Sequence, residues 1–197
     1  MIAYFGEGAT SEGDFHVGLN FAAVRKAPCL FFCRNNGYAI STPAGSQFAS
    51  AGIAPKGEGY GIQTYRVDGN DFFALYDVVK KAKEYALSGK GPVLIEAMTY
   101  RMGAHSTSDD PSRYRQEAEV EKWKKRCPIV RLRKHLLQRG LWSEKEEESY
   151  VQGVQKEIDI AIEGAQKTPL PPLSSLIEHV YFEVPEKLKR QMEGLHG

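Results

Sequence analysis

The chain has 197 residues, a formal net charge of +1 and a hydrophobic content of 42%. These values fit a globular protein with a sizeable core, and the near-zero charge gives no reason to expect binding to nucleic acid or to an anionic membrane. No apolar run approaches the roughly 20 residues that a membrane span needs.

The first part of the chain alternates apolar strand patterns with helical ones. Residues 2–5 (IAYF) are typical of a short buried strand, and a glycine-rich turn follows. Apolar residues then recur at helical spacing from Phe15, with Ser11 and Asp14 resembling a capping box. Residues 29–33 (CLFFC) form the next strand pattern. The chain has only three cysteines, which is too few for a disulfide framework, so we expect a reducing compartment.

The same alternation then repeats. Residues 62–67 (IQTYRV) are a strand pattern, and Asn70 or Asp71 is expected to cap a helix that Gly89 ends. A third buried strand follows in residues 92–100 (PVLIEAMTY). Apolar strands alternating with helices predict an α/β fold, a parallel sheet with helices on both faces.

The chain becomes polar after Arg101. Residues 102–126 indicate a long mobile loop that grades into a helix, and the remainder is helical and highly charged, with a proline-rich break (TPLPPL) before a last helix. We therefore assign residues 1–127 to the α/β core and residues 128–197 to a helical extension of the same domain.

Polar groups follow each of the first two strands. The turn GEG (residues 6–8) ends the first strand, and RNNG (residues 34–37) follows the second. Ligands bind at the carboxyl ends of parallel strands, and a right-handed crossover brings both turns to one edge of the sheet. We therefore expect Glu7 and the pair Asn35–Asn36 to face one ligand.

The residue types at this edge favour a hard cation with a phosphate group. Carboxylate and amide oxygens suit Mg²⁺ or Ca²⁺, and Mg²⁺ usually completes its shell with phosphate and water. A helix beginning after Gly8 would direct N–H groups at such a phosphate, Gly6 keeps the backbone bare, and Arg34 adds a cation. Gly-x-Gly or Asn-Gly alone indicates only a turn. The combination across strand, helix and strand is much more specific.

Two common nucleotide-binding patterns are absent. A P-loop needs Gly-Lys-Ser/Thr after its glycines, and a dinucleotide fingerprint needs a third glycine where this chain has Ser11. A carboxylate between the glycines would also repel a pyrophosphate unless a metal ion lay between them.

The segments GEGATSEGDFH and CRNNGYAISTP together resemble the thiamine diphosphate motif, Gly-Asp-Gly followed by Asn-Asn, with Glu7 in place of the aspartate. The chain resembles in particular the α subunits of branched-chain 2-oxo acid dehydrogenases, the decarboxylating component. The segments YRVDGND, LIEAMTYR and HSTSDDPSRYR carry this resemblance, which is strong over residues 1–140. Pyruvate or another 2-oxo acid dehydrogenase α subunit is the alternative within the family.

The resemblance implies a set of Mg²⁺ ligands. These are the carboxylate of Glu7, the side-chain oxygen of Asn36 and the backbone carbonyl of Tyr38. Gly37 would allow the backbone to turn between them, and Asn35 would serve the turn itself.

The resemblance also implies contacts to thiamine diphosphate. Arg34 would contact the diphosphate, Gly8 and Ala9 would offer backbone around it, and His105 would reach the diphosphate end and the active site as the catalytic acid or base. Family members often have a second histidine where this chain has Ala104. The other histidines lack such a context and are expected at the surface or in helix packing: His16, His135, His179 and His196.

A regulatory role is implied for Ser106, because the family's kinase modifies the serine after this histidine. A second regulatory serine of some members falls at Gln116 and is absent here. We expect residues 103–116 to be mobile without cofactor and to order on binding. Four residues would then lock this loop: Arg101, Asp109, Tyr114 and Arg115.

The implied activity is the oxidative decarboxylation of branched-chain 2-oxo acids such as 3-methyl-2-oxobutanoate, within branched-chain amino acid catabolism. The acyl group passes to a lipoyl-bearing transacylase. The implied partners are a β subunit in an α₂β₂ heterotetramer and a regulatory kinase and phosphatase, in the mitochondrial matrix of a eukaryote. Family members carry about as much chain again before the Gly-Glu-Gly turn, so we expect this chain to be a C-terminal half that is inactive alone.

Two hypotheses from other classes stay open at this point. The chain is a non-catalytic interaction fragment that retains only the fold, or it is a Mg²⁺-dependent nucleotide binder of unrelated chemistry. Titration with thiamine diphosphate and Mg²⁺ in the presence of a β subunit separates them.

Overall fold

The computed structural model describes residues 1–195. The chain forms two compact units that divide after Trp142. The predicted boundary at residue 127 lies earlier, and the intervening helix α6 (Pro128–Gln138) belongs to the first unit. Arg131 of α6 makes ion pairs with Asp68 and Asp71, which is the physical reason for this grouping. That the two parts form one domain stays a prediction.

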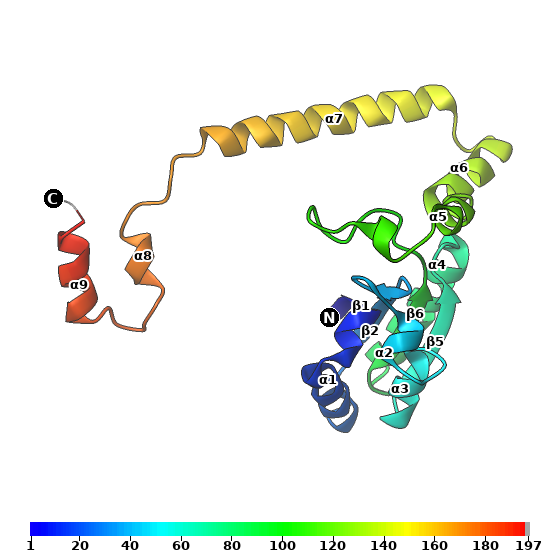
Figure 1. Cartoon of the computed structure of the whole chain (residues 1–197), viewed down its shortest axis with the longest axis horizontal. Coiled ribbons are helices and arrows are strands. Elements are labelled where there is room, and N and C mark those ends of the chain that lie inside the picture. Colours follow the sequence, from blue (N-terminus) through cyan, green and yellow to red (C-terminus); the bar gives the residue numbers. More distant parts are fainter. Residues whose placement is uncertain (196–197) are drawn as a thin grey trace. The chain divides into compact units, whose positions relative to one another are not determined.

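A four-stranded parallel sheet forms the centre of the first unit, in the order β1-β2-β6-β5 (Figure 1). Its strands are β1 (Ile2–Gly6), β2 (Leu30–Asn35), β5 (Gln63–Asp68) and β6 (Val93–Met98). Each strand predicted from an apolar run is present, and the predicted fold class is confirmed. β6 is the most buried strand, as its apolar sequence requires of a strand covered on both faces.

Helices cover both faces of this sheet. One face packs Phe32 and Ile95 against α4 (Phe72–Leu87), which contributes Ala82 and Ala86. The opposite face packs Cys33 and Leu94 against α1 (Gly13–Val24) and the start of α3 (Ala54–Gly59). Side chains alternate between the faces because successive residues of a strand point in opposite directions.

The segment after β1 differs from its prediction. Glu7–Ser11 form a 3₁₀ helix, η1, and α1 begins only at Gly13. The predicted capping box is wrong, because Ser11 ends η1 and Asp14 accepts a hydrogen bond from its neighbour Phe15. No long helix therefore begins directly after Gly8. β2 also runs further than predicted and includes Arg34 and Asn35.

Residues 38–61 have no predicted element, and the structure fills this segment with short ones. They are β3 (Tyr38–Ala39), β4 (Thr42–Pro43) and α2 (Ala44–Gln47), followed by α3. β3 and β4 form an antiparallel hairpin directly after Gly37, whose φ of +87° is the left-handed conformation that favours glycine. The expected role of Gly37 in the turn is confirmed.

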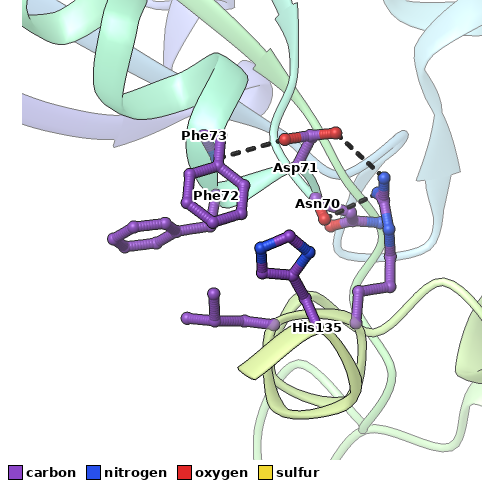
Figure 2. Close-up of a pocket in the computed structure, with 7 residues that line it drawn as sticks. Asn70, Asp71, Phe72, Phe73 and His135 are labelled. Atoms are coloured by element: carbon purple, nitrogen blue, oxygen red, sulfur yellow. Dashed lines mark hydrogen bonds and ion pairs between the residues drawn. The ribbon is translucent and has the colours of Figure 1, made fainter. Parts of the chain in front are cut away.

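The predicted cap of α4 is confirmed at Asp71. Its Oδ1 accepts hydrogen bonds from the backbone N–H groups of Phe73 and Ala74, both at 3.1 Å. Its Oδ2 lies 3.0 Å from Arg131. Figure 2 shows the contact between Asp71 and Phe73 beside a small cavity of about 160 Å³. The ring of His135 meets Phe73 edge-on across this cavity, at 5.0 Å between centroids. The predicted packing role of His135 is confirmed.

We expect Asp71→Ala to destabilise the chain by about 1 kcal/mol or somewhat more, because it removes an N-cap and an ion pair together. Asp71→Asn is the matched control, since asparagine also caps helices and loses only the charge. Urea unfolding of the chain measures both variants. Equal stability of the two variants would contradict the assignment of the cap.

The remaining elements are helical. In the first unit η2 (Pro111–Arg113) and α5 (Glu117–Lys124) lie within the segment predicted as a loop grading into a helix. The second unit contains α7 (Glu144–Lys167), α8 (Ser175–Glu178) and α9 (Glu186–Glu193). None of the helices in residues 1–195 is long and apolar enough to cross a membrane.

Candidate functional site

The two predicted turns meet at the carboxyl edge of the sheet. Glu7 is fully buried, and its Oε2 accepts hydrogen bonds from the backbone N–H and the side-chain Nδ2 of Asn36, at 3.0 and 3.1 Å. The expected pairing of Glu7 with the asparagine turn is therefore present. This double contact fixes the orientation of the carboxylate.

The other carboxylate oxygen of Glu7 has no hydrogen-bond partner among the described residues. A buried charged oxygen without a partner is costly, and a bound cation is one way to compensate it. The backbone beside it is held by Thr10, whose Oγ1 donates to the Glu7 carbonyl at 2.7 Å. Lys56 donates in turn to Thr10 Oγ1 at 3.0 Å. A carboxylate held in this way fits a hard cation such as Mg²⁺.

The other two expected metal ligands are arranged differently. The side-chain oxygen of Asn36 accepts a hydrogen bond from the Tyr38 backbone N–H at 3.3 Å, which keeps it close to the turn. The carbonyl of Tyr38 accepts from Arg101 at 3.3 Å. A carbonyl oxygen has two lone pairs, so this bond leaves one for another partner. Among residues 1–195 no cluster of three or more His, Cys, Asp or Glu side chains is placed to hold a metal ion.

A cavity of about 440 Å³ lies at the same edge. Two arginines, Arg34 and Arg101, line it together with Gly6, which has no side chain to narrow it. This polarity suits an anion such as a diphosphate. The full lining is Tyr4, Phe5, Gly6, Arg34, Asn36, Thr99, Tyr100 and Arg101.

Three residues expected at the diphosphate, Gly8, Ala9 and His105, do not line this cavity, and their contacts to the cofactor stay predictions. A side chain at Gly8 would meet Ala39 at 2.8 Å, so this glycine allows close packing of the β3 hairpin. Ala9 is exposed and lies beside a different surface hollow. His105 is exposed and does not line the cavity, but its Nδ1 lies 3.5 Å from Nη1 of Arg101, which does.

The loop after β6 is held by the four residues expected to lock it. Arg115 is buried and donates to the carbonyls of Arg101, Met102 and Gly103. Asp109 accepts from the backbone N–H of His105 at 2.8 Å and from the hydroxyl of Tyr114 at 2.7 Å, and Arg101 donates to that hydroxyl. Mobility without cofactor stays a prediction.

The pH below which this loop loses its order depends on Asp109. The hydrogen bond from the His105 backbone, followed by that from Tyr114, lowers the pKa of the Asp109 carboxyl. A carboxyl with a lowered pKa stabilises the folded loop fully above its unfolded pKa of about 3.9. This stabilisation is lost as pH falls through the pKa of the folded state.

We therefore expect protease cleavage in residues 103–116 to stay constant from neutral pH to about pH 5 once the protease's own pH profile is divided out, and to rise only below about pH 4. Asp109→Asn should cleave faster than the wild type at neutral pH, because it removes the charged acceptor, and the two rates should converge below about pH 4, where the wild-type carboxyl is protonated. A rise in cleavage near pH 6 would indicate that a histidine, and not Asp109, controls the loop.

The remaining histidines have structural surroundings. Nδ1 of His16 lies 2.9 Å from the Tyr60 hydroxyl, consistent with helix packing, and His179 is exposed after α8. His196 lies outside the described residues. Cys33 is fully buried, and burial together with the nearby carboxylates of Glu96 and Glu7 raises the pKa of its thiol, so it behaves as an inert hydrophobe.

Sequence reasoning missed the residues that support the site. Glu96 is fully buried in β6, and its Oε1 accepts a hydrogen bond from Asn35 at 2.7 Å. The available signal was a single charged residue within the apolar run PVLIEAMTY. Thr10 and Lys56 gave no such signal, because only the fold brings α3 next to η1.

Comparison with known proteins identifies the family of the chain. The model of the family described as "Dehydrogenase E1 component" matches residues 1–174. The chain belongs to this family. The E1 chain is 51% identical over 196 residues to the mitochondrial 2-oxoisovalerate dehydrogenase subunit alpha of Homo sapiens, covering 99% of the chain and 44% of that relative.

Relatives of similar identity also occur in a nematode and in a plant. The 2-oxoisovalerate dehydrogenase subunit alpha of Caenorhabditis elegans is 49% identical over 98% of the E1 chain and 45% of its own length. Subunit alpha 2 of Arabidopsis thaliana is 50% identical over 96% of the E1 chain and 40% of its own length. The E1 chain thus spans less than half the length of these relatives, all of which are named as mitochondrial.

Proposed function

We propose that this E1 chain is part of the α subunit of a branched-chain 2-oxo acid dehydrogenase and binds thiamine diphosphate with Mg²⁺. The observation that carries the proposal is the buried carboxylate of Glu7, with one oxygen held by Asn36 and the other without a partner among the described residues. It is supported by the neighbouring cavity, whose lining includes the two arginines Arg34 and Arg101.

Each residue then has a defined task. Glu7, Asn36 and the carbonyl of Tyr38 hold Mg²⁺, and Arg34 binds the diphosphate with help from Arg101. When bound, thiamine diphosphate supplies the nucleophilic carbon and the electron sink for decarboxylation.

His105 is the candidate acid or base. Arginine has only donors, so a hydrogen bond between Arg101 and Nδ1 of His105 requires Nδ1 to accept, which leaves the ring proton on Nε2. That N–H is then available to donate a hydrogen bond to a reacting group.

The names of the relatives support the proposed partners and compartment. Because they are named as alpha subunits, we propose a β subunit in an α₂β₂ heterotetramer, and a lipoyl-bearing transacylase as the acyl acceptor. Their names support the mitochondrial matrix. Regulation by a kinase and a phosphatase acting at Ser106 is part of the same proposal.

The test is turnover of the α subunit carrying this chain, assembled with its β subunit. We expect kcat/KM to be higher for 3-methyl-2-oxobutanoate than for pyruvate. A preference for pyruvate would favour the pyruvate dehydrogenase alternative, and the absence of decarboxylation of any 2-oxo acid would favour a non-catalytic role.

A further inference from the structure

Glu96 is a buried carboxylate without a role in the proposed chemistry. It lies in β6 between Cys33 of β2 and Arg66 of β5, and none of its surface is exposed. A carboxylate in the centre of a sheet needs specific partners, since its desolvation otherwise costs several kcal/mol. The partners of Glu96 show what it does.

The two oxygens of Glu96 contact two different segments. Oε1 accepts from the side-chain Nδ2 of Asn35 at 2.7 Å, and Oε2 accepts from the backbone N–H of Ala54 at 3.0 Å. Oε2 also lies 3.7 Å from Nε of Arg66. The loop closes tightly over this group, because a side chain at Gly52 would lie 2.8 Å from both oxygens.

Asn35 connects Glu96 to the turn that carries Asn36. Its side chain is 3% exposed, and its Oδ1 accepts from the backbone N–H of Gly37 at 3.1 Å. Asn36 lies between these two hydrogen-bonded residues and makes both contacts to Glu7. The position of Asn36 is thus determined by a chain of hydrogen bonds that begins at Glu96.

We propose that Glu96 and Asn35 are a positioning pair that fixes Asn36 against Glu7 and thereby sets the affinity of the site for Mg²⁺. The inference rests on the proposed function, because the cation is the one assigned to Glu7. Neither residue touches the cation; both act through the turn, as outer partners of metal ligands do.

The pair permits a swap experiment. In Asn35→Asp two carboxylates face each other, and in Glu96→Gln an amide replaces one of two acceptors, so each single variant leaves at least one bond unmade. In the double variant, which combines both substitutions, the amide N–H₂ introduced at position 96 donates to the carboxylate introduced at position 35. The amide carbonyl at position 96 still accepts from Ala54, and the second carboxylate oxygen at position 35 still accepts from Gly37. Every hydrogen bond is therefore restored.

The readout is the Kd for Mg²⁺ at saturating thiamine diphosphate, measured by calorimetry on the assembled enzyme, with circular dichroism as a check of folding. We expect each single variant to raise this Kd about 10- to 100-fold, the usual effect of losing an outer partner of a metal ligand. The double variant should return to within about threefold of the wild-type value, or bind more tightly, because the negative charge now lies nearer the cation.

Arg66→Gln is the matched control, since it removes the charged partner of Glu96 and leaves the bond to Asn35. It should lower thermal stability and leave the Kd for Mg²⁺ unchanged within about twofold. Unchanged affinity in the single variants, failed restoration in the folded double variant, or an equal loss in Arg66→Gln would each overturn the inference. If one single variant does not fold, the other single variant and the double variant decide together. If the wild-type enzyme shows no Mg²⁺-dependent binding, the proposed function fails instead.

Discussion

Glu7→Ala is expected to abolish Mg²⁺-dependent binding of thiamine diphosphate by the assembled enzyme. The variant removes a buried charge that faces the expected cation and leaves the diphosphate without a neutralising metal ion. Because losing an outer partner of a metal ligand already costs about 10- to 100-fold, losing the ligand itself should exceed about 100-fold.

Asn36→Ala should have an effect of similar size for a different reason. It removes the side-chain donor to Glu7 Oε2 and with it the second contact that orients the carboxylate. It also removes the amide oxygen that would serve as a ligand. Glu12→Gln is the matched control, because Glu12 is an exposed carboxylate on the same turn.

Calorimetric titration of cofactor with and without Mg²⁺ measures all three variants. The assignment fails if Glu7→Ala or Asn36→Ala keeps the wild-type response to Mg²⁺, or if Glu12→Gln loses it. Because the Glu7 carboxylate is buried, its replacement could also disturb the fold. Circular dichroism of each variant checks that the fold is retained.

Phosphorylation of Ser106 is expected to inactivate the assembled enzyme while the metal site stays intact. The serine is exposed, so a kinase has access to it, and its carbonyl accepts a hydrogen bond from the Asp109 backbone at 3.2 Å. A phosphoserine carries about −1.5 to −2 charges. These charges would lie beside the carboxylates of Asp109 and Asp110, and repulsion would break the contacts that hold His105 and Tyr114.

The expected size of this effect follows from the lost contacts. Asp109 accepts two hydrogen bonds, from the His105 backbone and the Tyr114 hydroxyl, and losing both frees the segment that carries His105, so turnover should fall steeply. Ser106→Glu adds one charge and should reduce turnover with cofactor binding largely retained. Ser106→Ala should resist the kinase and keep activity.

Turnover before and after stoichiometric phosphorylation, with modification verified by mass spectrometry, measures this effect. Ser112→Glu is the matched control. Ser112 lies in the same loop and donates a hydrogen bond to Asp110, but it is not adjacent to His105 as Ser106 is. Unchanged turnover of enzyme phosphorylated at Ser106, or equal inactivation by Ser112→Glu, would remove the regulatory interpretation.

The parts of the fold that sequence predicted well are those governed by local pattern. Apolar runs identified all four strands of the sheet, and Asp71 was recognised as a cap because its side chain serves its own helix. The meeting of Glu7 with Asn36 followed from topology, since a right-handed crossover leaves the two turns only one edge to share.

The residues that sequence reasoning missed depend on contacts distant in the chain. Glu96 meets Asn35 across 61 positions, and Lys56 meets Thr10 across 46. The short segment Glu7–Ser11 was misread for a related reason: it tightens into a 3₁₀ helix with Lys56 bonded to Thr10, a contact that no local pattern encodes. The close packing of Gly8 against Ala39 was not foreseen either, because the two residues lie far apart in the chain.

The central claim is that the edge formed by Glu7 and Asn36 holds Mg²⁺ and thiamine diphosphate. The most direct measurement is calorimetric titration of thiamine diphosphate into the α subunit assembled with its β subunit, with Mg²⁺ present and then removed by chelation, and with ATP as the competing ligand. We expect saturable binding of thiamine diphosphate that disappears with Mg²⁺, and no Mg²⁺-dependent binding of ATP. Binding that is indifferent to Mg²⁺, or a preference for ATP, would contradict the account.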